Sequence, residues 1–220
     1  MAPYFERNGI VIYHGDCREI LPTLVFDVIV TDPPYGIGWS RGMNAARNSK
    51  PHNGIVNDTD TSMRDAVLSA YPYVPAVVFG SFYAPFPASL RQVIVWQKPP
   101  DAGVVGSTTG YRRDAEPIFL VGLWPMTTVR WSSVIQSGGS IAHVTRETGH
   151  PHTKPINLLR RLIERCPPGV ICDPFMGSGT TLRAAMNQGR RAIGIEIEER
   201  YCEIAANRLS QQVLPLGEVA

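Results

Sequence analysis

The stretch from Gly169 to Glu196 constrains the fold more than any other part of the chain. Its apolar start, Gly169 to Cys172, predicts a strand, and the turn D-P-F-M-G-S-G-T-T at 173–181 leads into a helix that ends at Asn187. A second strand, Arg191 to Glu196, then ends in an acid. Glycines at such a turn let the backbone approach a ligand closely. This order is typical of nucleotide-binding α/β folds, in which an acid at the same place binds ribose hydroxyls.

The turn itself indicates which nucleotide is bound. A dinucleotide fingerprint reads G-x-G-x-x-G, but no third glycine follows Gly177 and Gly179 at that spacing. Asp173 stands before the turn, where a carboxylate opposes a pyrophosphate and suits a cationic ligand. S-adenosylmethionine has a sulfonium, an amino group and no phosphate, so the sequence favours it over NAD. The alternative is a tight turn followed by a surface glutamate.

A second turn follows an apolar run near the start of the chain. Phe26 to Thr31 predicts a buried strand, and D-P-P-Y occupies positions 32–35. Two successive prolines have no N–H groups to continue a strand ladder, so the strand must stop here. An acid, two rigid prolines and an aromatic ring are therefore held at its tip. The alternative is an ordinary Asp-Pro turn.

The rest of the chain alternates short β-rich runs with helical patterns. Strands are predicted at 10–13, 76–80, 92–97 and 117–123, and helices at 17–24, 62–71, 155–166 and from the last strand to about 212. This alternation predicts an α/β fold with a largely parallel sheet. The 220 residues suit a single domain, 1–220, in which 36–60 is a long polar loop.

Composition excludes several classes of protein. Hydrophobic residues are 44% and charged residues 18%, as in a globular protein. No apolar run reaches the roughly 18–20 residues that span a bilayer, and the N-terminus lacks a signal-peptide pattern, so a cytoplasmic protein without a membrane segment is expected. The four cysteines form no C-x-x-C pair, and His150 and His152 have no further ligand types beside them, so no metal is expected. The net charge of +2 neither demands nor excludes nucleic acid.

With D-P-P-Y and D-P-F-x-G-S-G-T-T together, the chain resembles the amino-directed DNA methyltransferases, which methylate N6 of adenine or N4 of cytosine. Three further segments are similar to this family: H-P-H-T-K-P at 150–155, V-W-Q-K at 95–98 and Y-R-R-D-A-E-P-I at 111–118. The motif order, with D-P-P-Y first and the cofactor loop last, matches the circularly permuted β group. The resemblance implies a Rossmann-like S-adenosylmethionine-dependent methyltransferase fold, with a mostly parallel sheet and helices on both faces.

The permuted order gives the N-terminus a function. An unpermuted enzyme would continue beyond Glu196 with a strand ending in an acid near the cofactor's adenine. Here the N-terminal run Ile10 to Tyr13, followed by His14 and Asp16, supplies that strand. Asp16 is therefore expected near the adenine. The alternative role for Asp16, a helix N-cap, is compatible with this one.

The family resemblance also assigns catalytic roles. An exocyclic amine is a poor nucleophile because its lone pair is delocalised into the ring. Asp32 is expected to accept one N–H of the amine and the carbonyl of Pro33 the other, while Pro34 stiffens the turn. Tyr35 is expected to stack on the flipped-out base. In this family Asp at the first position favours adenine, but cytosine N4 and RNA adenine remain alternatives.

The residues expected to bind the cofactor are Asp16, Lys154, Asp173, Phe175, Gly177, Ser178, Gly179, Thr180 and Glu196. By resemblance, Lys154 binds the cofactor's carboxylate; the alternative is a solvated lysine before a helix. The expected partner is double-stranded DNA, with phosphate contacts from Arg41, Arg47, Lys50, Arg112, Arg113, Arg130 and Arg146. The expected target-recognition insertion, 124–149, is short. Three explanations stay open: a short recognition site, a contribution from the 36–60 loop, or a homodimer.

Other classes of function remain as rivals. A protein-glutamine methyltransferase would favour Asn at the position of Asp32. A non-catalytic binding subunit is disfavoured because both motifs are intact. An NAD oxidoreductase is disfavoured by the missing third glycine and by Asp173.

Overall fold

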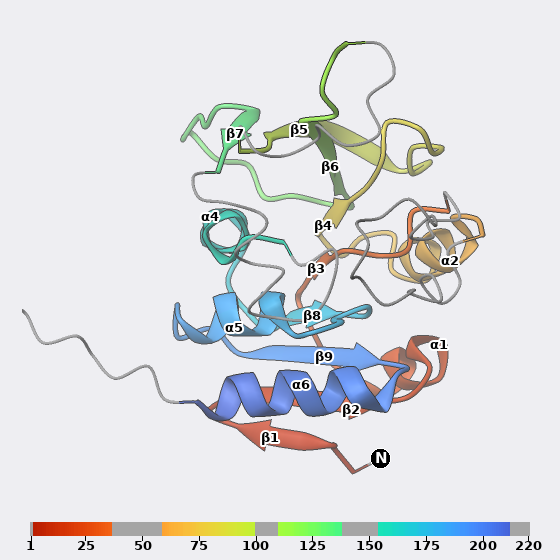
Figure 1. Cartoon of the computed structure of the whole chain (residues 1–220), viewed down its shortest axis with the longest axis vertical. Helices are drawn as coiled ribbons and strands as arrows, with labels where there is room; N and C mark the ends of the chain where they lie inside the picture. The colour runs from red at the N-terminus through yellow and green to blue at the C-terminus, as the bar shows by residue number, and fades with distance from the viewer. Residues whose placement is uncertain (1, 37–58, 100–109, 138–153, 212–220) are drawn as a thin grey trace, which may run out of the picture.

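The middle of the sheet consists of short strands whose residues are buried on both faces. In the computed structural model, which describes residues 2–36, 59–99, 110–137 and 154–211, every residue of β3 (Val28–Thr31), β4 (Ala76–Phe79) and β8 (Ile171–Asp173) is buried. Strands that are covered on both sides by helices are typical of parallel sheets. These three strands lie side by side, with β3 between β8 and β4 (Figure 1).

Nine strands form the sheet within the described residues, in the order β1-β2-β9-β8-β3-β4-β6-β5-β7. The remaining strands are β1 (Phe5–Arg7), β2 (Ile10–His14), β5 (Leu90–Gln97), β6 (Ala115–Val121), β7 (Val134–Gln136) and β9 (Ala192–Glu196). The pairs β1–β2, β4–β6 and β5–β6 are antiparallel, and the other neighbours are parallel. The prediction of a largely parallel sheet is confirmed.

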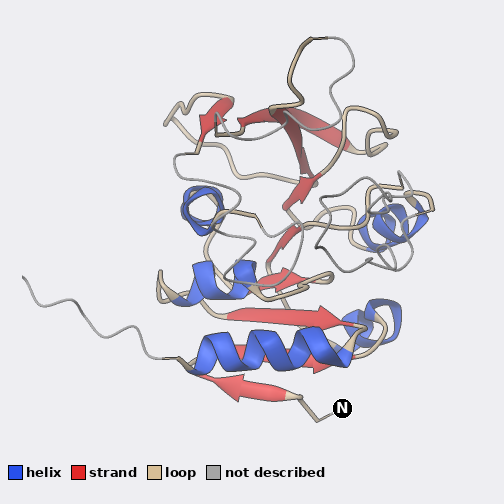
Figure 2. Cartoon of the chain, viewed as in Figure 1, coloured by secondary structure: helices blue, strands red, loops and turns tan. Residues whose placement is uncertain are grey.

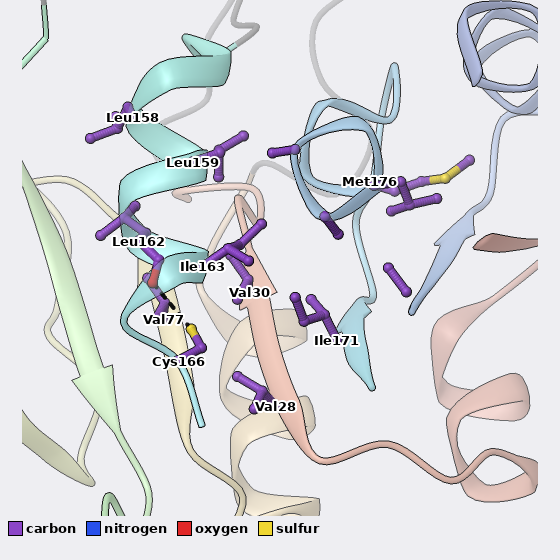
Figure 3. Close-up of a cluster of buried hydrophobic side chains, with 14 of the residues drawn as sticks. Val28, Val30, Val77, Leu158, Leu159, Leu162, Ile163, Cys166, Ile171 and Met176 are labelled. Atoms are coloured by element: carbon purple, nitrogen blue, oxygen red, sulfur yellow. Dashed lines mark hydrogen bonds between the residues drawn. The ribbon is translucent and has the colours of Figure 1, made fainter. Parts of the chain in front are cut away.

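Helices cover both faces of the sheet (Figure 2). One face packs against α1 (Cys17–Ile20), the 3-10 turn η1 (Leu21–Thr23) and α2 (Ser62–Ala70); the other packs against α4 (Ile156–Glu164), α5 (Thr180–Met186) and α6 (Glu199–Ser210). Successive side chains of β3 point to opposite faces of the sheet and contribute to the hydrophobic cluster on each face. Val28 and Val30 belong to the cluster on the side of α4, and Ile29 belongs to the cluster on the other side. Figure 3 shows α4 alongside β3 and β8, with Ile163 and Val30 in the buried cluster between them.

The two ends of the chain meet in the sheet, as the permuted motif order predicts. Strand β2 pairs in parallel with β9, and His14 lies opposite Glu196. The N–H of Gly15 donates to the carbonyl of Glu196 at 2.9 Å, just beyond the paired residues. The carboxyl ends of β2 and β9 therefore lie at the same edge of the sheet, so the N-terminal strand supplies the element that an unpermuted chain would carry after Glu196.

The structure contains two edge strands that the sequence did not predict, and several strand boundaries differ from the predicted ones by one or two residues. Strands β1 and β7 were not predicted, because each has three residues and neither has an apolar run. Strand β6 begins at Ala115, two residues before the predicted start at Pro117, whose missing N–H favours the first position of a strand. None of the helices in the described ranges is long and apolar enough to span a bilayer.

Candidate active site

The two motifs of the sequence line one cavity of about 360 Å³ at the carboxyl ends of β2, β3, β8 and β9. Ligands of open α/β sheets bind at this edge. The D-P-P-Y turn follows β3, and the glycine turn follows its neighbour β8. A buried hydrogen bond joins them, because the hydroxyl of Thr31 donates to Oδ1 of Asp173 at 2.7 Å. The two turns are thereby fixed relative to each other.

Backbone hydrogen bonds to two carboxylates hold the glycine turn, 173–181. Asp173 accepts from the N–H of Phe175 at 3.2 Å, and Glu196 accepts from the N–H of Gly177 at 3.0 Å. Gly177 has φ of 49° and Gly179 has φ of 78°, a region that residues with a side chain rarely adopt. The backbone of the turn is therefore shaped before any ligand arrives.

An arginine that the sequence analysis did not single out supports the same turn from outside. Arg208 of α6 donates to the carbonyl of Ser178 at 2.5 Å, and its guanidinium lies 3.4 Å from Oγ1 of Thr180. Ser178 and Thr180 are both buried. Arg208 lies 28 positions after Thr180 in the chain, and no sequence pattern links the two residues. The contact becomes visible only when α6 packs beside the turn.

Of the nine residues expected to bind the cofactor, all except Gly179 line the cavity. Gly179 instead faces α6, where an added Cβ would lie 2.8 Å from Cβ of Ala205. This glycine is needed for the close approach of the turn to α6. The prediction that Gly179 contacts the cofactor therefore lacks support from its position.

The cavity favours a cationic ligand at the cofactor end. Burial raises the pKa of Asp173 to about 6, although hydrogen bonds from Thr181, Thr31 and the N–H of Phe175 oppose the shift. Burial also raises the pKa of Glu196. A positive charge placed beside these carboxylates would restore their ionised form. The ammonium and sulfonium of S-adenosylmethionine fit this arrangement, whereas a pyrophosphate would be repelled by it.

Asp16 caps a helix, as the sequence suggested, while its contact with the cofactor's adenine stays a prediction. Its carboxylate caps α1 by accepting from the N–H of Arg18 at 2.9 Å, and it also pairs with the guanidinium of Arg18. The hydrogen bonds from Arg18 lower the pKa of Asp16. Asp16 also lines the cavity beside the carboxyl end of β9.

At the other end of the cavity, Asp32 belongs to a group of four charged side chains and one tyrosine, here called the charged cluster: Asp32, Tyr35, Lys98, Glu116 and Lys154. Nζ of Lys154 lies 3.0 Å from Asp32 Oδ2 and 2.9 Å from Glu116 Oε1, and Nζ of Lys98 lies 2.8 Å from Glu116 Oε2. The hydroxyl oxygen of Tyr35 lies 2.8 Å from Asp32 Oδ1 and 2.5 Å from Glu116 Oε1, and it accepts from Lys154 at 2.8 Å. Two acids and two lysines balance in charge.

The cluster shifts the ionisation of its members. Burial acts to raise the pKa of Glu116, but the ammonium groups of Lys154 and Lys98 outweigh it and lower the pKa to about 2. Burial acts to lower the pKa of Lys154, and the carboxylates of Asp32 and Glu116 reverse this and raise it. The pKa of Tyr35 is raised well above its usual value, first by burial and then by the two carboxylates. Glu116 and Lys154 are thus charged at neutral pH while Tyr35 stays protonated.

The position of Lys154 contradicts one of its two sequence interpretations and leaves the other untested. The alternative of a solvated lysine is wrong, because Lys154 is only 8% exposed. Its three N–H groups are matched by three acceptors, on Asp32, Glu116 and Tyr35. A contact with the cofactor's carboxylate would require one of these to be exchanged, so that role stays a prediction.

The structure describes three of the seven residues predicted to contact DNA, and these three have different surroundings. Arg113 lines the cavity, Arg112 pairs with Asp114 at 2.9 Å, and Arg130 donates to the carbonyl of Thr127 at 2.5 Å. Arg41, Arg47, Lys50 and Arg146 lie outside the described residues, as do His150, His152, residues 37–58 of the predicted loop and residues 138–149 of the predicted insertion. Among the described residues, no group of three His, Cys, Asp or Glu side chains could hold a metal ion.

Comparison with known sequences points to one family. A family model described as DNA methylase, for N6/N4 methyltransferases, matches residues 122–207. The type II methyltransferase M2.DpnII of Streptococcus pneumoniae is 46% identical, across 96% of this chain and 93% of the relative. The type II methyltransferase M.ScaI of Streptomyces caespitosus is 28% identical, across 97% of this chain and 86% of the relative.

Solved structures show the same fold. The complex of M1.HpyAVI with SAM aligns with a TM-score of 0.60 at 24% identity, across 90% of this chain and 99% of that one. The cytosine-N4-specific PvuII DNA methyltransferase aligns with a TM-score of 0.63 at 19% identity, across 96% of this chain and 90% of that one. The likeness extends over nine tenths or more of this chain in both comparisons.

Proposed function

Because the chain belongs to the N6/N4 family of S-adenosylmethionine-dependent DNA methyltransferases, we propose that it methylates the exocyclic N6 amine of a flipped-out adenine in double-stranded DNA. The observation that carries the proposal is the shared cavity, in which the D-P-P-Y turn and the glycine turn are joined by the 2.7 Å bond from Thr31 to Asp173. An amine held at the first turn would be adjacent to a cofactor held at the second.

The residues at the glycine turn would hold the cofactor. Asp173 would face its ammonium, Glu196 its ribose hydroxyls and Asp16 its adenine, with the backbone around Gly177 close by. Support comes from the position of all four residues in the cavity and from the raised pKa of Asp173, which favours a cationic partner. When bound, S-adenosylmethionine supplies an electrophilic methyl group on its sulfonium.

The residues at D-P-P-Y would prepare the amine. Asp32 accepts one N–H and the carbonyl of Pro33 the other, so the nitrogen lone pair is released from the ring. As the N–C bond forms, the bond between the methyl group and the cofactor's sulfonium would break and leave a neutral thioether. The nitrogen would lose one proton, for which the carboxylate of Asp32 is the acceptor at hand. Tyr35 and Lys154 contact the two oxygens of Asp32 at 2.8 and 3.0 Å and hold that carboxylate in place.

The choice of adenine depends on Asp at the first position of D-P-P-Y, which favours adenine in the family that the sequence resembles. The alternative is cytosine N4, which presents a similar amine to the same acceptors. RNA adenine is a further alternative, because the catalytic contacts proposed here involve the base and not the sugar. Nucleoside analysis of the methylated product separates the first two, and a comparison of DNA with RNA substrates tests the third.

Replacement of Asp32 tests the proposed site. We expect Asp32→Ala to lower methyl transfer at least about 100-fold, because it removes a preorganised acceptor of the amine. Cofactor affinity, measured by isothermal titration, should stay close to that of the unmodified protein. The control is Glu203→Ala, which removes an exposed acid of α6 that is not part of the cavity. Near-normal turnover of Asp32→Ala would refute the assigned role.

A further inference from the structure

One loop beside the cavity carries three exposed aromatic side chains. The loop between β4 and β5 presents Phe82, Tyr83 and Phe86, which are 47%, 73% and 44% exposed. Phe82 and Tyr83 also line the cavity, so they stand at its mouth and not on a remote surface. Large aromatic side chains left in solvent beside a binding cavity indicate a surface that a ligand covers.

The loop that carries these side chains is anchored at both ends. Its Phe86 ring packs against Phe119 of β6 with the ring centroids 4.8 Å apart. Arg64 of α2, itself buried, donates to the carbonyl of Pro85 at 2.8 Å. The N–H of Tyr83 donates to Oγ of Ser81 at 3.1 Å. The backbone that carries Tyr83 is therefore fixed at the mouth before a ligand binds, which reduces the entropy lost on binding.

A cation from a different part of the chain meets this ring. Arg113, in the turn before β6, places its guanidinium 5.1 Å from the ring centroid of Tyr83, and it also lines the cavity. Its neighbour Arg112 differs, because it pairs with Asp114 and does not line the cavity. The mouth thus combines an aromatic face with a guanidinium, whereas the charged cluster deeper inside is balanced in charge.

We propose that Tyr83 and Arg113 bind the target nucleotide as it leaves the duplex: Tyr83 stacks on the base, and Arg113 binds the phosphate beside it. A guanidinium matches the geometry of a phosphate, and an aromatic ring stacks on any base. Neither contact distinguishes adenine from cytosine. The pair therefore promotes extrusion of the nucleotide and leaves the choice of base to the residues deeper in the cavity. This assignment depends on the proposed function and names the residues that deliver its substrate.

The test compares Tyr83→Ala and Arg113→Met with two controls, Tyr73→Ala and Arg160→Met. Tyr73 is also 73% exposed but does not line the cavity. Arg160 is an exposed arginine of α4 outside the cavity. The substrate is a duplex containing the site methylated by the wild-type protein. We expect Tyr83→Ala to lower transfer about 10- to 100-fold, as the loss of one base–aromatic stack does. Both controls should stay near the wild-type rate, and Tyr83→Phe, which keeps the ring, should retain most activity.

A second substrate identifies the step. A mismatch opposite the target base lowers the cost of extrusion, so it should restore most of the transfer lost in Tyr83→Ala. For Arg113→Met, the slope of log affinity against log salt concentration should decrease by about one, because one phosphate contact is removed. Cofactor affinity should not change in either variant.

Several results would overturn the assignment. The first is full methyl transfer by Tyr83→Ala, and the second is an equal loss of transfer in Tyr73→Ala. The third is a loss in Tyr83→Ala that the mismatched substrate does not restore. An unchanged salt slope in Arg113→Met would exclude the phosphate contact. If the wild-type protein methylates no DNA, the proposed function fails together with this one; an active wild type with unaffected variants overturns only the assignment of Tyr83 and Arg113.

Discussion

Glu116 holds the charged cluster together, and replacing it by glutamine gives a quantitative test of that cluster. Its carboxylate lies 2.9 Å from Nζ of Lys154 and 2.8 Å from Nζ of Lys98, and the residue is 8% exposed. Glu116→Gln keeps the shape of the side chain and removes its charge. Lys98 then loses its ion pair with Glu116, and Lys154 keeps its ion pair with Asp32 alone.

The size of the effect follows from the pKa of Glu116, which is lowered from an ordinary 4.5 to about 2. A difference of this size between the folded and unfolded states corresponds to about 3 kcal/mol of folding free energy at pH 7. Because the folded-state pKa is the lower one, this contribution is fully present above pH 4.5 and is lost as pH falls toward 2. At pH 3 about 1 kcal/mol should remain.

Urea denaturation at pH 7 and at low pH measures this contribution. Glu116→Gln should lower the free energy of unfolding by about 3 kcal/mol at pH 7 with an unchanged m-value, and by much less near pH 3. The control is Glu203→Gln, at an exposed position of α6 outside the cavity, which should change stability little at either pH. A loss for Glu116→Gln that is the same at both pH values would show that packing and not charge is responsible, and would refute the electrostatic reasoning.

Two further predictions concern the cofactor end of the cavity. Because the pKa of Asp173 is raised to about 6, ligand binding that requires its ionised form should weaken as pH falls below 6; isothermal titration of S-adenosylmethionine between pH 7.5 and 5 measures this. Burial also raises the pKa of Glu196, so this residue would contribute to the same pH dependence. Asp173→Asn separates the two contributions: it should bind S-adenosylmethionine more weakly, and its affinity should depend less on pH. Gly179→Ala should destabilise the protein by about 3 kcal/mol, because φ is 78° and the added Cβ lies 2.8 Å from Ala205. Gly189→Ala is the matched control, with φ of 65° and nothing within 4 Å, and should cost only about 1 kcal/mol in thermal unfolding.

The sequence carried enough information to bring the two motifs together. Each turn follows a strand of buried residues, and the carboxyl ends of parallel strands meet at one edge, so β3 and β8 had to present Asp32 and Asp173 to a common space. The motif order also predicted that the N-terminal strand would pair with β9. The positions of the two turns follow from local patterns, whereas the position of the N-terminal strand followed from the permuted motif order of the family that the sequence resembles.

The charged cluster could not be predicted in the same way. Glu116 precedes a proline that normally begins a strand, so the sequence placed it outside β6; in the structure β6 begins at Ala115, and pairing with β5 brings Glu116 toward Lys98. Lys154 comes from the start of α4, far away in sequence, and meets them only through the fold. The four charges come from four separate parts of the chain. Segments 95–98, 111–118 and 150–155 each resemble the family, but no spacing between them shows that their charged side chains meet. The support of Ser178 by Arg208 escaped prediction for the same reason.

The most direct test of the account is to identify the methylated nucleoside. The wild-type protein and Asp32→Ala are incubated with unmethylated duplex DNA and isotope-labelled S-adenosylmethionine, and the DNA is digested to nucleosides for mass spectrometry. The account predicts labelled N6-methyladenine with the wild-type protein and at least about 100-fold less with Asp32→Ala. Labelled N4-methylcytosine would contradict the proposed base and keep the site. Transfer to DNA that is equally fast without the carboxylate of Asp32 would contradict the site itself.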